Sequence, residues 1–138
     1  MTRSQILTLK AGGAEAASTT QAGVVFRETF KSVLLMLKVS AAATLVGDTL
    51  NVYIDTSPDG GTTWFNVGAF TQVLGNGGAK TFTMALGEDN PGASAVFDVT
   101  SNASAGATRQ VGIADRLRAR SVIVGTGSFT YSVTGIAK

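Results

Sequence analysis

Apolar and polar residues alternate with a period of two along most of the chain, and this pattern predicts β-strands rather than helices. Clusters of Gly, Pro, Asn and Asp separate the alternating segments at short intervals and predict turns. Short strands at this spacing predict an all-β fold, an antiparallel β-sandwich or a small barrel of about eight strands. The expected strands are Gln5–Lys10, Thr29–Ser40, Leu50–Thr56, Thr62–Val67, Lys80–Leu86, Val96–Thr100, Arg116–Val124 and Ser128–Ile136.

The position of apolar residues within three of these strands indicates which faces are buried. Between Thr29 and Ser40 both faces carry apolar residues, so we expect a central strand that is buried on both sides over its middle. Leu50–Thr56 and Lys80–Leu86 carry apolar residues on one face each, as half-buried strands do. The expected inward positions of these two strands are Leu50, Val52, Ile54, Phe82, Met84 and Leu86.

Two segments are built almost entirely of small, weakly polar residues. Ala11–Ala22 and Ser101–Ala107 offer little side chain to bury, so we expect both to be long loops or arms. A chain of 138 residues is long enough for one hydrophobic core. We therefore expect a single β domain over residues 1–138, with an extended N-terminal arm or loop over about residues 1–22.

A local motif occupies residues 57–64, Ser-Pro-Asp-Gly-Gly-Thr-Thr-Trp, and matches the pattern S-x-D-x-G-x-T-W at every fixed position. The Asp59 carboxylate can accept hydrogen bonds from nearby backbone N–H groups, Gly61 allows a positive φ, and Trp64 can cover the turn. The motif resembles the Asp-box of sialidases and related propellers. In those families the box is structural, so the resemblance implies a structural hairpin formed with Ser57, rather than a catalytic or sugar-binding site.

The absence of histidine and cysteine removes most catalytic and metal-binding chemistry. The remaining candidates for acid–base catalysis are two carboxylate pairs, Asp55 with Asp59 and Asp98 with Asp115. The first pair flanks a turn, where Asp is common, and the sequence does not place the second pair together. Glu88-Asp89-Asn90 offers too few oxygens to hold calcium alone. We therefore expect no enzyme activity, no cofactor and no metal.

The charge of the chain also limits its partners. Its net charge is +2 and its basic residues form no cluster, so no nucleic-acid binding is expected. The longest apolar run, Val33–Leu37, is far shorter than the roughly 20 residues that span a bilayer. The first residues lack the apolar segment of a secretory signal. We expect that the protein is made in a cytoplasm and that it does not associate with a membrane.

One charge pattern stands apart, because Arg116, Arg118 and Arg120 occupy alternate positions. In a strand all three point to one face, whereas Leu117 and Ala119 point inward. Two interpretations are open: an ordinary solvated strand face, or a contact with an acidic partner protein. If the three arginines face an acidic partner, their replacement by Gln is expected to weaken binding and to leave folding intact, because outward side chains contribute little to the core.

The stretch Asn51–Trp64, followed by Arg116–Arg120 and the closing Gly127–Gly135, resembles small β-rich virion proteins of tailed bacteriophages. Within that group the chain is most similar to capsid decoration, or cement, proteins. The resemblance implies a β-sandwich, jelly-roll or tulip-like module on the outer surface of the phage head. It further implies binding to the major capsid protein and assembly as a homo-oligomer such as a trimer.

The expected function is therefore that of a non-enzymatic structural protein that decorates the capsid and stabilises the shell through many weak contacts. Another virion component, in the tail or the head-to-tail connector, is an alternative. A carbohydrate-binding β-sandwich module is a second alternative, which requires exposed aromatic rings as stacking platforms. Because few charges protect the strand edges, we also expect self-association through strand edges and small-residue surfaces.

Overall fold

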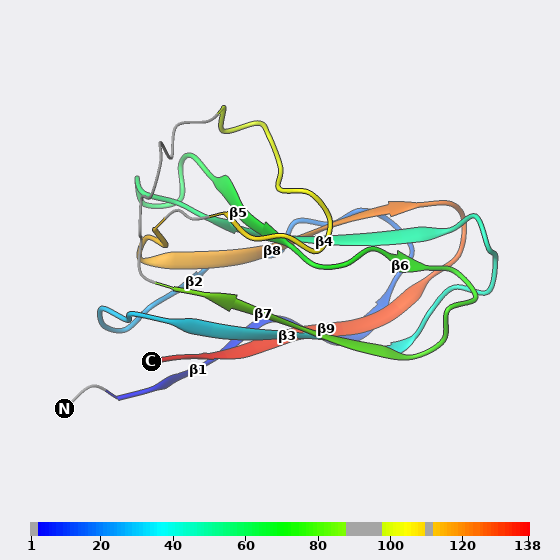
Figure 1. Ribbon diagram of the computed structural model, residues 1–138, viewed down its shortest axis with the longest axis horizontal. Coiled ribbons are helices and arrows are strands. Elements are labelled where there is room, and N and C mark those ends of the chain that lie inside the picture. Colours follow the sequence, from blue (N-terminus) through cyan, green and yellow to red (C-terminus); the bar gives the residue numbers. More distant parts are fainter. Residues whose placement is uncertain (1–2, 88–97, 110–111) are drawn as a thin grey trace.

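The computed structural model describes residues 3–87, 98–109 and 112–138, which form two antiparallel β-sheets packed face to face (Figure 1). The first sheet has the order β1 (Gln5–Glu15), β9 (Phe129–Ala137), β3 (Val33–Ala41) and β7 (Lys80–Leu86). The second has the order β2 (Val24–Val25), β8 (Arg116–Val124), β4 (Thr49–Thr56) and β5 (Phe65–Ala69), and β6 (Val73–Leu74) also pairs with β4. The prediction of an all-β antiparallel sandwich is confirmed, with nine strands in the described residues.

The core fills the space between the two sheets. Alternate apolar residues of β3 and β4 point into it, and these residues are at most 1% exposed. They are Val33, Leu35, Leu37, Val39, Leu50, Val52 and Ile54. The inward positions predicted for β4 are thereby confirmed. On β7, Met84 and Leu86 are buried as predicted and Phe82 is half-buried against the same core.

The prediction that the strand starting near Thr29 is buried on both sides is wrong. The strand itself, β3, lies inside its sheet between β9 and β7. Its second face, however, leaves Leu34 46% and Met36 37% exposed. A sheet in a two-layer sandwich is covered on one face only, so the apolar residues of the other face stay at the surface.

The prediction of a loop over Ala11–Ala22 is wrong for its first part, because residues 11–15 continue β1 and pair with β9 as far as Glu15↔Phe129. Backbone hydrogen bonds hold this ladder together, and they need no large side chains. The following residues run along β8, where Thr20 bridges Arg120. The N-terminal segment expected as an arm over residues 1–22 is thus packed on its own chain from Gln5 onward.

Other strand boundaries also differ from expectation, and β3 begins at Val33 rather than Thr29. β5 begins at Phe65 rather than Thr62, because the preceding residues belong to the turn of the hairpin motif. The strand expected over Val96–Thr100 is wrong for residues 98–100, which form a turn in which the Asp98 carboxylate accepts the Thr100 N–H at 2.8 Å. Residues 96–97 lie outside the described residues. The bounds of β8 agree with the prediction, and residues 101–107 contain no strand, as expected.

Candidate functional site

The hairpin motif between β4 and β5 is organised by two short side chains. The Ser57 hydroxyl donates to Asp59 Oδ1 at 2.9 Å and accepts the Gly61 N–H at 2.8 Å. Asp59 Oδ1 also accepts the Thr63 N–H at 2.7 Å. Gly60 and Gly61 adopt φ values of 76° and 95°, which residues with a Cβ rarely adopt. The Thr63 N–H, followed by the Thr63 and Ser57 hydroxyls, holds the pKa of Asp59 below its ordinary value.

Trp64 connects this turn to the second sheet. Its indole N–H donates to the Gly61 carbonyl at 2.9 Å, and the Arg118 guanidinium lies over its ring, 4.4 Å from the ring centroid. The ring also lies against Gly23, where an added Cβ would come within 2.6 Å of it. The motif residues therefore act on the turn and on neighbouring segments of the same chain.

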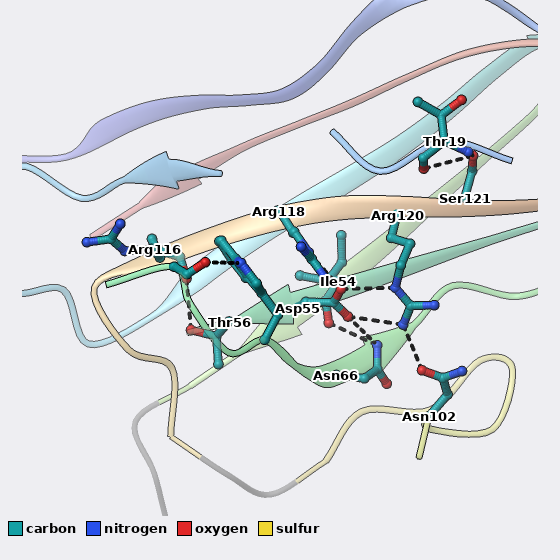
Figure 2. Close-up of polar contacts among 12 residues, drawn as sticks. Thr19, Ile54, Asp55, Thr56, Asn66, Asn102, Arg116, Arg118, Arg120 and Ser121 are labelled. Atoms are coloured by element: carbon teal, nitrogen blue, oxygen red, sulfur yellow. Dashed lines mark hydrogen bonds and ion pairs between the residues drawn. The ribbon is translucent and has the colours of Figure 1, made fainter. Parts of the chain in front are cut away.

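A buried carboxylate lies near the end of β4, on the side of the second sheet that points away from the core. Asp55 is 2% exposed, although it occupies the side of β4 that points away from the core. Arg118 Nε and Arg120 Nε each donate to Asp55 Oδ2 at 3.0 Å, and Arg120 Nη2 donates to Oδ1 at 3.3 Å (Figure 2). The two arginine side chains are 21% and 24% exposed. The carboxylate thus has two cations as partners and is shielded from solvent.

Two asparagines complete this network. The pairing of β4 with β5 is irregular between Ile54 and Asp55, and there the Asn66 amide donates to the Ile54 carbonyl at 3.0 Å and to Asp55 Oδ1 at 3.3 Å. Asn66 Oδ1 accepts the Ala103 N–H at 2.8 Å, and Asn102 Oδ1 accepts from Arg120 at 2.7 Å. Residues 98–109, the yellow segment in Figure 1, are tied to the network in this way. Sequence reasoning missed both asparagines, although Asn is depleted in strands and so marks position 66.

The arginine stripe makes its contacts within the chain. Arg116 pairs with the exposed Asp115 at 2.8 Å and donates to the Gly60 carbonyl at 2.9 Å. Arg120 lies 4.7 Å from the centroid of the Tyr53 ring. Leu117 and Ala119 point inward and are buried, as expected from the alternation. The contact of the stripe with an acidic partner stays a prediction, and the acidic groups that these arginines face in the structure belong to their own chain.

The candidate catalytic carboxylates are each occupied by neighbouring donors. Asp55 accepts from the arginines, and Asp59 accepts from its turn. Hydrogen bonds from Thr100 hold the pKa of Asp98 below its ordinary value, and the Arg116 side chain does the same for Asp115. A general acid at neutral pH needs a raised pKa, so Asp59, Asp98 and Asp115 are poorly suited to that role.

Within the ranges that the structure describes, no three His, Cys, Asp or Glu residues lie together as a metal site would require. The candidate calcium ligands Glu88-Asp89-Asn90 lie outside the described residues. The described part of the chain also contains no helix long and apolar enough to cross a membrane.

A second buried polar cluster, which sequence reasoning also missed, joins β1 to β9 and β8. The Lys10 ammonium donates to the carbonyls of Ala11, Gly13 and Tyr131 at 2.9 to 3.1 Å. The Tyr131 hydroxyl donates to Glu15 at 2.6 Å, and the same carboxylate accepts from Ser121 at 3.1 Å. Lys10 lies between two register shifts of the β1–β9 ladder. Its ammonium group therefore donates to carbonyls in the irregular part of the ladder.

This cluster predicts a fall in stability at alkaline pH that depends on Tyr131. Burial, together with the hydrogen bond to Glu15, raises the pKa of Tyr131 well above its ordinary value of about 10. As the pH rises, the unfolded state loses this proton before the folded state does. The free energy of unfolding therefore keeps its full value below pH 10 and falls by up to about 1.4 kcal/mol per pH unit above it. Urea unfolding of wild type and Tyr131→Phe between pH 8 and 11 measures this difference. Parallel stability curves for the two proteins above pH 10 would contradict the prediction.

The outer face of the first sheet differs in character from these clusters. Strand pairing aligns one apolar row across all four strands, and a second row, mainly of threonines, lies beside it. The two rows, which we call the outer face, consist of Ile6, Ile136, Leu34 and Ala85, and of Thr8, Thr134, Met36 and Thr83. Ile6 is 81% exposed. None of these eight side chains is charged, and Lys38 follows in the next row.

Comparisons of this chain with protein-family models, with curated proteins and with solved structures find no match.

Proposed function

We propose that this chain is a structural virion protein of a tailed phage, a capsid decoration protein that binds the major capsid protein on the outer surface of the head. The observation that carries the proposal is the outer face, whose two uncharged rows extend across four strands and present Ile6, Leu34 and Met36 to solvent. Exposed apolar surface of this extent is typical of interaction sites. The resemblance of residues 51–64, 116–120 and 127–135, taken together, to small β-rich virion proteins of tailed phages supports the same function. The chain acts without catalysis, is made in the host cytoplasm and assembles on the particle.

The mechanism is adhesion through many small contacts. Burying apolar surface contributes about 25 cal/mol per Å², so one outer face binds weakly after the cost of association is subtracted. A homo-oligomer such as a trimer presents several faces at once, and the second contact forms at a high effective concentration. The shell is stabilised because one oligomer bridges several capsid subunits.

The two alternatives make different demands. A tail or head-to-tail connector protein could use the same face, and its few copies per particle would separate it from a decoration protein. A carbohydrate-binding module needs exposed rings, but every aromatic side chain in the described residues is at least partly buried. Trp64 and Tyr53 also carry arginine guanidiniums on their rings. The geometry therefore favours a virion protein over a sugar-binding module.

A lysine placed within the outer face tests this function. In Thr134→Lys, an ammonium enters the middle of the contact and loses water on binding, so affinity for capsids stripped of this protein should fall at least tenfold, or about 1.4 kcal/mol. Thr62→Lys, at an exposed position of the hairpin, is the matched control and should bind as wild type does. Cosedimentation with purified heads measures both, and a count of copies per particle accompanies it. Equal binding by the two variants would show that the outer face does not contact the capsid.

A further inference from the structure

Both edges of the second sheet are covered by other parts of the chain. Along β8, the Gln21 N–H donates to the Ala119 carbonyl at 2.9 Å, and the Ser121 N–H donates to the Thr19 carbonyl at 2.8 Å. Along β5, the Ala69 N–H donates to the carbonyl of residue 107 at 2.9 Å. These segments use edge hydrogen-bonding groups that would otherwise be free to pair with another chain.

The β1 edge of the first sheet is protected in a different way. Its ladder with β9 shifts register twice, between Thr8 and Lys10 and between Lys10 and Gly13. The side chain of Lys10 is turned inward and is 6% exposed. Bulges and inward-pointing charges are two devices by which natural sheets prevent pairing at an edge.

The β7 edge has none of these protections within the described residues. Its ladder with β3 runs from Val33↔Leu86 to Val39↔Lys80 without a register shift. Between these ends, residues 81–85 contain no charge and no proline. A regular, uncharged edge of this kind is suited to accept a further strand.

A groove of about 500 Å³ lies beside this edge. It is lined by β7 residues 81–85 on one side and by residues 69–71 and 106–108 on the other, and none of these residues is charged. An occupant that matches the groove and the edge is therefore an uncharged extended strand.

We propose that the occupant is β7 of a second copy of this chain, paired antiparallel across a two-fold axis with Thr83 opposite Thr83. This register places Phe82 opposite Met84 of the second copy, both on the inward side. It also places Thr81 opposite Ala85 of the second copy, both on the outward side. The edge thus complements itself, as a two-fold contact requires. The two four-stranded sheets join into one continuous sheet, and Phe82 and Met84 of each copy point toward the groove of the other.

The contact is small. A strand of seven residues is about 24 Å long, and one strand pair buries less than the roughly 800 Å² per partner of a standard interface. We therefore expect a reversible dimer. The inference rests on the self-association part of the proposed function. It assigns a two-fold contact, and hence a dimer rather than a trimer, to this edge.

Charge substitutions at Thr83 test the pairing in the full chain. Thr83 is exposed, so Thr83→Lys and Thr83→Glu should fold as wild type does, which circular dichroism and thermal melting establish. In each variant, like charges meet across the two-fold axis, so the dimer dissociation constant from sedimentation equilibrium should rise at least about tenfold. Mixing the two variants in equal amounts should restore dimers, because Lys then faces Glu. Thr134→Lys, in the same row but on β9, should dimerise as wild type does.

Several results would overturn the pairing: a wild type that is monomeric at every concentration, a dimer or trimer unaffected by Thr83→Lys, or no recovery on mixing. Dissociation by Thr134→Lys as well would place the contact on the outer face instead. Capsid binding is measured separately, so a protein that dimerises through Thr83 but binds no capsid contradicts only the decoration function. Capsid binding that survives in a monomeric wild type contradicts only the edge pairing.

Discussion

The double variant Arg118→Gln/Arg120→Gln is expected to lose about 3 to 5 kcal/mol of its free energy of unfolding, because it leaves a buried carboxylate without a cation. Asp55 is 2% exposed and receives three hydrogen bonds from these two side chains. Glutamine can donate one neutral hydrogen bond but carries no charge to offset the desolvation of the carboxylate. Urea unfolding at neutral pH measures the loss. The expectation reverses the one drawn from alternation alone, in which outward arginines contribute little to folding.

Two companion variants isolate the cause. Arg116→Gln removes an arginine of the same stripe whose partner, Asp115, has a side chain 62% exposed, so the variant should unfold at nearly the same urea concentration as wild type. Adding Asp55→Asn to the double variant removes the unpaired charge and should recover part of the lost stability. If the double variant and Arg116→Gln unfold at the same urea concentration, Asp55 does not depend on its two arginines.

Lys10→Met should cost about 3 kcal/mol, the second largest effect that we expect. The substitution keeps much of the side-chain volume but leaves three carbonyl oxygens and the nearby Glu15 carboxylate without their cation. Since these carbonyls belong to the irregular part of the β1–β9 ladder, the loss should appear first as faster amide hydrogen exchange in β1.

Lys38→Met is the control for this substitution. Lys38 lies on the exposed side of β3 and should change stability by no more than about 0.5 kcal/mol when replaced. Unchanged exchange rates in β1 of Lys10→Met, or equal stability losses for the two variants, would show that the buried ammonium does not hold the ladder together.

Because both polar clusters satisfy their own hydrogen bonds, they stabilise the fold and leave other parts of the surface for binding. Among the buried side chains that the structure describes, no polar nitrogen or oxygen lacks a hydrogen-bond partner. The outer face and the β7 edge have the opposite character, with exposed apolar side chains in one case and a regular unprotected strand in the other.

The features that the sequence determined by itself are the local ones. Alternation with period two specified the strands around Leu50–Thr56 and Arg116–Val124, because side chains on a strand point to opposite faces in turn. The turn at residues 57–64 was equally readable, since Ser57 and Asp59 bond to groups no more than four residues away. Short-range chemistry of this kind needs no knowledge of which strands are neighbours.

Only the tertiary structure decided the features that depend on neighbouring strands. Leu34 and Met36 are exposed because the sandwich has two layers and no third layer covers this sheet. Residues 11–15 became a strand because β9 lies beside them to accept their hydrogen bonds. Asp55 is buried because β8 brings two arginines from more than 60 residues away, and because residues 98–109 lie close by. Such pairings are set by strand order, and alternation along one chain carries no information about strand order.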